Sequence, residues 1–268
     1  MNVPKSFVDL IYSKSLKENY IGMGNPNAKI LVIGREPAHD LNTEEGQEAH
    51  RQDQELNRKN WQNIIEGNQV EGRCNPRRPF PNQRCFPQNE SGQGTSNTWI
   101  WYQKLIDLIL GREYDRGYML RPVDFHDFCF HTDISSASAK SLATTNKEAK
   151  KLSVEKRSTE LFAKEFFKQF PITILAIGKD VGKGNYVPLE WCEQVLGFPR
   201  EEVIEKTYID EKGHPQMIWL NKDSRNHRIL VHTRCLSQNV SYEYIGKLRD
   251  LLWEEGFGNS YYCWPSAY

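Results

Sequence analysis

The sequence predicts an α/β protein, a three-layer α/β/α sandwich around a four-stranded, mainly parallel sheet. Four short apolar runs alternate with segments whose apolar residues recur at helical spacing. Unbroken apolar runs are typical of strands buried on both faces, which belong mostly to parallel sheets, and right-handed crossovers then place helices on both faces. A chain of 268 residues can bury one large core, so we predict a single domain over residues 1–268.

Each predicted strand is followed by polar residues where it ends. The four strands are Ile30–Ile33, Phe125–Phe130, Ile172–Gly178 and Arg228–His232. In chain order, the polar residues at their ends are Glu36 and His39, His131 and Asp133, Lys179 and Asp180, and His232 and Arg234. The carboxyl ends of parallel strands meet at one edge of a sheet, and ligands bind beyond that edge. We therefore expect these side chains to form one functional site.

Amphipathic segments predict the helices around this sheet. They span about residues 5–17, 57–65, 97–110, 161–170, 187–196 and 244–252. Alternation between Val203 and Trp219 predicts a hairpin, and the lysine-rich stretch 144–156 predicts a mobile surface segment. Residues 41–96 form a long irregular insertion, in which 71–94 carry four prolines and four arginines without an apolar period. Long ordered loops tend to be functional, so we expect the insertion to contribute to the site.

Composition limits the partners of the chain. Its 35 lysines and arginines balance its 35 aspartates and glutamates, so DNA binding requires a local basic patch. The six cysteines form no C-x-x-C pair and no spacing typical of zinc ligands, and we predict neither a metal nor a cofactor. No segment approaches about eighteen consecutive apolar residues, so we predict no membrane span. These features indicate a soluble, reduced, cytoplasmic protein, for which we expect a monomer.

The motifs at the strand ends resemble those of the uracil-DNA glycosylase superfamily. IGREPAH (33–39) is similar to the family's first motif, a buried strand followed by G-Q-D-P-Y-H, and VHTRCLS (231–237) is similar to its last, H-P-S-P-L-S. CFHTDIS (129–135) stands where the family has a strand ending in L-N-T, and AIGKD (176–180) resembles a strand ending in W-G-K or W-G-S. The resemblance covers about Lys29 to Trp253. It implies a monofunctional DNA glycosylase that flips a base out of DNA and hydrolyses its N-glycosidic bond.

Two residues occupy the family's catalytic positions. Glu36 stands where the first motif has its water-activating aspartate, although glutamate is one methylene longer. A carboxylate there stabilises the oxocarbenium-like sugar cation and orients the attacking water. His232 falls on the histidine that hydrogen-bonds O2 of the base while negative charge develops on the leaving group.

The substrate-binding positions depart from the family's pattern. Ala38 replaces the tyrosine that packs against C5 of uracil and excludes a methyl group, and His131 replaces the asparagine that binds the O4 and N3 edge. A neutral imidazole can accept a hydrogen bond from an exocyclic amine, so His131 suits a cytosine edge. Phe86, or alternatively Phe80, corresponds to the phenylalanine on which the base stacks. With Arg35 and His39 beside them, these changes favour a 5-substituted pyrimidine such as a hydroxymethylcytosine derivative, a kind of base found in some viral DNAs. Antiviral defence is the role that would follow.

The resemblance also implies DNA contacts. Leu236 matches the leucine that wedges into the duplex and fills the gap left by the flipped nucleotide, and a leucine between Cys235 and Ser237 is hard to explain as core. Arg234 replaces a serine of the family and could hold a phosphate. The other residues that we expect to contact DNA are Ser237, Ser96, Lys179, Arg77 and Arg78.

The sequence leaves three other functions open. A uracil-DNA glycosylase of base excision repair would differ only in its substrate. A non-catalytic DNA-binding protein would keep the fold and the wedge without the chemistry. An unrelated α/β enzyme acting on a nucleotide or phosphate ester would require a phosphate-binding glycine loop, and GKDVGKGNY (178–186) does not match the P-loop spacing.

Overall fold

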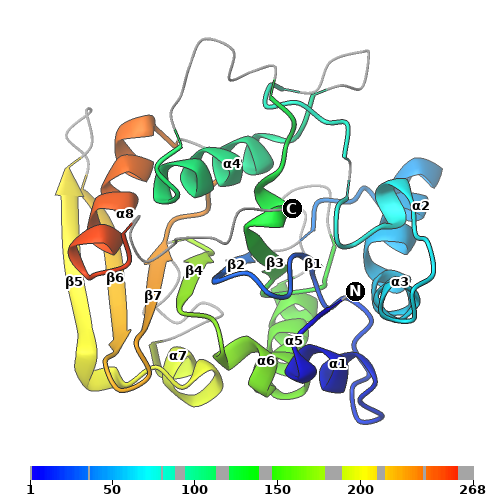
Figure 1. The fold of residues 1–268 in the computed structure, drawn as a ribbon, viewed down its shortest axis with the longest axis horizontal. Helices are drawn as coiled ribbons and strands as arrows, with labels where there is room; N and C mark the ends of the chain where they lie inside the picture. The colour runs from blue at the N-terminus through cyan, green and yellow to red at the C-terminus, as the bar shows by residue number, and fades with distance from the viewer. Residues whose placement is uncertain are drawn as a thin grey trace.

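The fold is seen in a computed structural model of the chain (Figure 1). The structure describes residues 2–35, 37–79, 81–87, 94–112, 121–138, 147–178, 189–209, 215–237 and 240–258. Within these residues, it is a mixed α/β protein built around a seven-stranded sheet with the order β1-β3-β2-β4-β7-β6-β5. The mixed α/β class predicted from the sequence is confirmed.

The middle of the sheet consists of parallel strands. They are β3 (Cys129–Asp133), β2 (Ile30–Gly34), β4 (Ile172–Ala176) and β7 (Arg228–Thr233). All residues of β2 and β4 are buried, as expected for strands covered on both faces. Because the four strands run in the same direction, their carboxyl ends lie at one edge of the sheet.

Antiparallel strands extend this sheet on both sides. On one side, β6 (Pro215–Asp223) pairs with β7 and with β5 (Val203–Ile209), which confirms the predicted hairpin. On the other side, β1 (Met23–Gly24) pairs with β3. The prediction of four strands is therefore wrong. A two-residue strand has no periodicity to detect, and the hairpin joins the sheet through β7 instead of standing apart from it.

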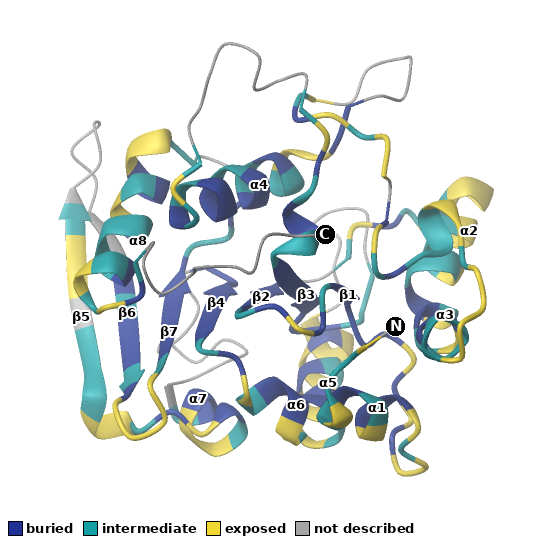
Figure 2. Ribbon diagram, viewed as in Figure 1, coloured by how far each residue is buried: buried dark blue, intermediate teal, exposed yellow. Residues whose placement is uncertain are grey.

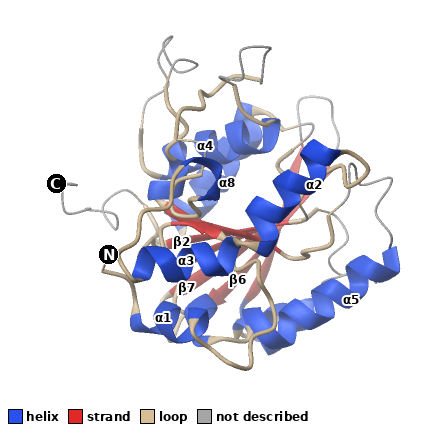
Figure 3. Cartoon of the chain, turned by 90° about the vertical axis from the view of Figure 1, so that its right-hand side faces the viewer, coloured by secondary structure: helices blue, strands red, loops and turns tan. Residues whose placement is uncertain are grey.

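Helices cover both faces of the sheet. The α-helices of the described residues are α1 (Lys5–Ile11), α2 (Glu44–His50), α3 (Asn57–Ile65), α4 (Asn97–Ile109), α5 (Lys147–Arg157), α6 (Glu165–Lys168), α7 (Leu189–Leu196) and α8 (Tyr242–Glu254). Figure 3 shows α4 and α8 on one side of the strands and α1 and α5 on the other, with α2 and α3 in front of the sheet edge. The parallel strands between them are almost entirely buried, whereas the edge strand β5 is intermediate to exposed (Figure 2).

The two faces of β2 belong to separate hydrophobic clusters, as its alternating side chains require. Leu31 and Ile33 pack with residues of α1, α6 and α7. Ile30 and Val32 pack with residues of α4 and α8. One strand thus anchors helices on both faces, and its carboxyl end is fixed from both sides.

Some predicted elements have different bounds in the structure. Residues 125–127 form a helical turn, so the second parallel strand begins at Cys129 and not at Phe125. The segment 144–156 was predicted to be mobile, but Lys147–Arg157 form α5, in which Val154 and Arg157 are buried. Lys147, Lys151 and Lys156 are exposed, whereas Lys150 is buried with Val154 and Arg157 on the side of α5 that packs against the protein.

Arg157 lies completely buried beneath the end of β3. Its guanidinium donates hydrogen bonds to the Asp133 carbonyl oxygen (3.1 Å), the Tyr20 carbonyl oxygen (2.7 Å) and Thr132 Oγ1 (2.9 Å). The Glu18 carboxylate lies 3.5 Å away, and burial lowers the pKa of Arg157. The buried cation is thus compensated by one carboxylate, by two oxygens of β3 and by the carbonyl oxygen of Tyr20, which precedes β1.

Replacing Arg157 should destabilise the fold strongly. Arg157→Met leaves the buried Glu18 carboxylate and several oxygens without their donor, which should cost about 3 to 5 kcal/mol in the free energy of unfolding. Urea denaturation measures the effect. Lys151→Met, an exposed change on the same helix, should shift this free energy by less than about 0.5 kcal/mol. Equal effects of the two substitutions would contradict the assigned role of Arg157.

Candidate functional site

The site lies beyond the carboxyl ends of the parallel strands. The strands that follow β2 in the chain lie on opposite sides of it, β3 on one side and β4 on the other. In open parallel sheets, ligands bind at such a switch in strand order, here between the ends of β2 and β4. A Cβ added to Gly178, just after β4, would lie 3.7 Å from Arg35 Nη1 and 3.7 Å from the Cys235 backbone nitrogen. The ends of β2, β4 and β7 therefore meet around Gly178.

Polar side chains gather above Gly34, the last residue of β2. His131 and Asp133 are alternate residues of β3 and lie on the same face, with His131 Nε2 3.5 Å from Asp133 Oδ1. The Tyr102 ring of α4 lies 5.3 Å from the His131 ring. A Cβ on Gly34 would come within 2.5 Å of Asp133 Oδ1 and 3.0 Å of the Tyr102 hydroxyl. The absence of a side chain at position 34 thus leaves room for the cluster.

Asp133 is held by a phenol as well as by the imidazole. The Tyr20 hydroxyl donates a hydrogen bond to Asp133 Oδ2 at 3.2 Å. Burial raises the pKa of Tyr20 well above its usual range, and the Asp133 carboxylate raises it further. Tyr20 is therefore a neutral phenol at physiological pH and acts as a hydrogen-bond donor to the carboxylate.

His39 is held by residues of the insertion. Its Nε2 lies 3.6 Å from Asp53 Oδ2, and Arg73 binds both oxygens of Asp53 at 2.9 and 2.6 Å. Burial lowers the pKa of His39, and the Asp53 carboxylate opposes that shift. The His50 ring packs 5.7 Å from the His39 ring. The predicted contribution of the insertion to the site therefore includes holding one of its imidazoles.

His232 is completely buried at the end of β7. Its Nε2 lies 3.2 Å from the Gly178 carbonyl oxygen, and its ring stacks on Trp219 at 5.0 Å. Burial lowers the pKa of His232 to about 4, against the opposite effect of the Gly178 carbonyl. A carbonyl oxygen can only accept, so Nε2 carries the proton and Nδ1 is an acceptor. Among the described residues, Nδ1 has no hydrogen-bond partner.

The structure brings several of the predicted site residues together. Arg35, His39 and His131 lie around the ends of β2 and β3, whereas Ala38 is exposed beside them. Phe86 is half-buried, and its carbonyl oxygen accepts a hydrogen bond from the Thr95 nitrogen just before α4. Glu36, Lys179 and the alternative Phe80 lie outside the described residues, as does Asp180.

The prediction that Leu236 is exposed is wrong. Its side chain is 0% exposed and packs in the cluster that includes Tyr244 and Ile245 of α8. Tyr244 also binds the end of β7, because its hydroxyl contacts Thr233 Oγ1. The chain thus turns back onto α8 directly after β7 and carries Leu236 into the core. A wedge role for Leu236 would require the loop to move.

The other predicted DNA-binding residues have partners within the protein. Arg77 and Arg78 both bind Asp127, at 2.8 and 2.7 Å, near the amino end of β3 and not at the carboxyl edge. A shallow pocket of about 240 Å³ lies beside Arg78 and Asp127. Arg234 lies 5.6 Å from the centre of the Tyr244 ring.

The two predicted serines make local contacts. Ser96 accepts a hydrogen bond from the Trp99 nitrogen and so caps α4. Ser237 Oγ lies 3.1 Å from Cys235 Sγ.

Sequence reasoning missed three residues of the site. Tyr20 and Asp53 belong to segments without a motif, and Tyr102 lies on a helix whose apolar face predicts packing only. They reach the site through contacts between distant parts of the chain. Tyr20 and Asp133, for example, are 113 residues apart.

No family model, curated protein or solved structure matches the chain. In the part of the chain that the structure describes, no helix is long and apolar enough to cross a membrane. In the same residues, no three histidine, cysteine, aspartate or glutamate side chains gather as they would around a metal ion. Arguments about function therefore depend on the motifs and on the site geometry.

Gly34→Ala should disturb the Asp133 cluster. The new methyl group would overlap Asp133 Oδ1 and press on the Tyr102 hydroxyl, which should lower the free energy of unfolding by about 1 to 3 kcal/mol. Gly246→Ala is the control, because a Cβ there meets nothing within 4 Å. In the interior of α8 this control change should raise stability by about 0.5 to 1 kcal/mol. Denaturation curves that rank the variants in the opposite order would refute this geometry.

The burial of His232 should make stability depend on pH. The pKa of His232 is about 4 in the folded protein against an ordinary value of 6.5, so the unfolded chain binds the extra proton between these values. The free energy of unfolding should fall as the pH drops from 6.5 to about 4, by up to about 3 kcal/mol. Above the ordinary value this contribution is fully present.

Urea denaturation of the wild type and of His232→Gln at a series of pH values isolates the effect. The difference between the two free energies of unfolding should shrink as the solution is acidified. A difference that stays constant over the whole range would rule out a neutral, buried His232.

Proposed function

We propose that the protein is a monofunctional DNA glycosylase acting on a 5-substituted pyrimidine, such as a hydroxymethylcytosine derivative. It would flip the base out of DNA and hydrolyse the N-glycosidic bond to leave an abasic site. The observation that carries the proposal is the meeting of β2, β4 and β7 around Gly178, with His131 and Asp133 at the adjacent end of β3. The four motifs that resemble the uracil-DNA glycosylase superfamily come from these same strand ends.

Two residues would carry the chemistry. Glu36 follows β2 by two residues and would orient water and stabilise the sugar cation. His232 would move its Nε2–H from the Gly178 carbonyl oxygen to O2 of the base, where negative charge develops. Because burial holds the pKa of His232 at about 4, this donor is a neutral imidazole at physiological pH.

The choice of substrate rests on two positions. Ala38 is small and exposed, which supports space for a substituent at C5 of the pyrimidine. The Nε2 of His131 faces Asp133, which favours the tautomer with the proton on Nε2 and a lone pair on Nδ1. A lone pair accepts from the exocyclic amine of a cytosine, whereas O4 of uracil requires a donor.

A second candidate is a non-catalytic DNA-binding protein of the same fold. Two observations favour it. The Nε2 proton of His232 is engaged by Gly178, and Leu236 is buried where a wedge would project. Both side chains must change their contacts before the glycosylase mechanism operates, and a binding protein has no such requirement.

Base release from a panel of oligonucleotides tests the proposal. The panel carries uracil, thymine, cytosine, 5-hydroxymethylcytosine or glucosylated 5-hydroxymethylcytosine, and alkali cleaves the abasic sites that form. We expect cleavage at the 5-substituted cytosines. Glu36→Gln should lower the rate at least about 100-fold, because it removes the general base and the negative charge.

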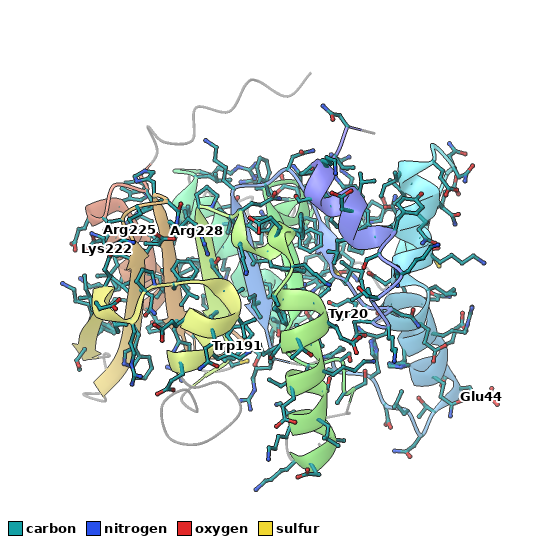
Figure 4. The ribbon with its side chains drawn as sticks, turned by 90° about the horizontal axis from the view of Figure 1, so that it is seen from below. Tyr20, Glu44, Trp191, Lys222, Arg225 and Arg228 are labelled. Atoms are coloured by element: carbon teal, nitrogen blue, oxygen red, sulfur yellow. The ribbon has the colours of Figure 1, made fainter. Side chains whose placement is uncertain are left out.

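Glu44→Gln is the matched control. Glu44 is exposed and stands at the outer end of α2, pointing away from the protein (Figure 4). This variant should keep the wild-type rate. Cleavage confined to uracil would contradict the proposal that the substrate is a 5-substituted pyrimidine, but it would support DNA glycosylase activity. DNA binding without any release would leave the binding protein as the function.

A further inference from the structure

Two aromatic rings and a lysine form a cluster where α4 and α8 pack together. Trp101 of α4 and Tyr242 of α8 meet edge to face, with ring centres 5.6 Å apart. Lys104 Nζ lies 4.4 Å from the centre of each ring. Tyr242 is 48% exposed, and Trp101 and Lys104 are half-buried. We call these three residues the aromatic platform.

The platform is close to the candidate site. Tyr242 is the first residue of α8, and Tyr244, two residues later, contacts Thr233 at the end of β7. Trp101 lies in the second turn of α4, the helix that also contributes Tyr102 to the Asp133 cluster. The ends of both helices that carry the platform thus lie next to the carboxyl edge of the sheet. The beginnings of α4 and α8 are therefore within reach of a DNA strand that places a base at this edge.

The chemistry of the platform suits a nucleotide. A base stacks on an aromatic face with little dependence on its sequence, and an adjacent cation attracts the phosphate. With a formal net charge of zero, the protein has no general attraction for DNA and depends on local groups of this kind. Lys104 is held between the rings, so its charge is positioned in advance.

We propose that the aromatic platform of Trp101, Lys104 and Tyr242 binds an unpaired nucleotide of single-stranded DNA next to the nucleotide held at the carboxyl edge. The proposal rests on the proposed function, because it takes DNA as the partner. It adds a preference for single strands. Paired bases are stacked on one another and do not offer their faces to a protein ring. The buried Leu236 fits the same preference, because it does not project to fill a gap in a duplex.

Fluorescence anisotropy with an unmodified oligonucleotide tests the platform. Single-stranded and duplex forms of about 12 nucleotides span a typical single-strand site. The wild type should bind the single strand more tightly than the duplex. The double substitution Trp101→Ala with Tyr242→Ala should weaken single-strand binding at least about tenfold, since each stacked base contributes to affinity. Tyr242→Ala alone, at a half-exposed position, should give a smaller loss in the same direction without affecting folding.

Lys104 provides a second readout that a purely structural role would not change. The affinity for DNA falls with salt concentration in proportion to the number of phosphates that the protein neutralises. Lys104→Gln should lower the slope of log affinity against log salt by about 0.7 for a single strand. This variant keeps both aromatic side chains.

The matched control is the similar pair at the other end of α8, where the Arg249 guanidinium lies 4.8 Å from the centre of the Trp253 ring. Trp253→Ala removes a comparable half-buried ring far from the first turn of α8 and should leave single-strand affinity unchanged. Thermal unfolding of every variant confirms that the proteins compared are folded.

Three results would overturn the inference. They are an unchanged affinity in both the double variant and Tyr242→Ala, an equal loss on single strands and duplexes, and a wild type that binds no DNA. The base-release assay decides the proposed function separately. If DNA binding depends on the aromatic platform but no base is released from any oligonucleotide, the proposed glycosylase activity is refuted. The proposed role of the platform in binding is then retained.

Discussion

Asp133 joins the sheet, the buried arginine and the candidate site through one set of contacts. Its carbonyl oxygen accepts from Arg157, while its carboxylate accepts from Tyr20 and faces His131. Arg157 also binds the Tyr20 carbonyl oxygen, so Tyr20 is held at both its backbone and its hydroxyl. A buried carboxylate is tolerated only when its oxygens have such partners. The same contacts that compensate the charge therefore fix the imidazole of His131, and the glycine at position 34 leaves room for all of them.

The insertion acts on the other side of the site through Asp53. The pairing of Arg73 with both oxygens of Asp53 orients the carboxylate, and the carboxylate in turn faces His39. Planar, two-point pairing of this kind fixes geometry as well as charge. The prediction that residues 41–96 are irregular is wrong for this part of the insertion, because Asp53 lies in the helical segment Arg51–Glu55 between α2 and α3. Two histidines of the site, His39 and His131, are thus each positioned by a carboxylate from a different part of the chain.

The sequence predicts the parts of this fold that follow from local pattern. The strands β2 and β4 are buried throughout, so their apolar runs are unambiguous, and polar residues after a parallel strand fall at one edge whatever the rest of the chain does. Asp53 and Tyr20 could not be predicted as site residues, because their roles depend on contacts with distant residues. The prediction for Leu236 is wrong because it relied on the local pattern alone. Its polar neighbours indicate an exposed loop, but the turn after β7 directs this one side chain into the core.

The buried positions of His232 and Leu236 imply that the proposed base excision requires a local rearrangement. Both side chains lie at or just after the end of β7, and both are completely buried. A base that reaches the Nε2 of His232 must displace the Gly178 carbonyl, which lies where β2, β4 and β7 meet. Release of Leu236 is a separate requirement, because its side chain would have to leave the cluster that includes Tyr244 and Ile245. Single-stranded DNA does not need Leu236 as a plug, so for that substrate the rearrangement could stop at Gly178 and His232.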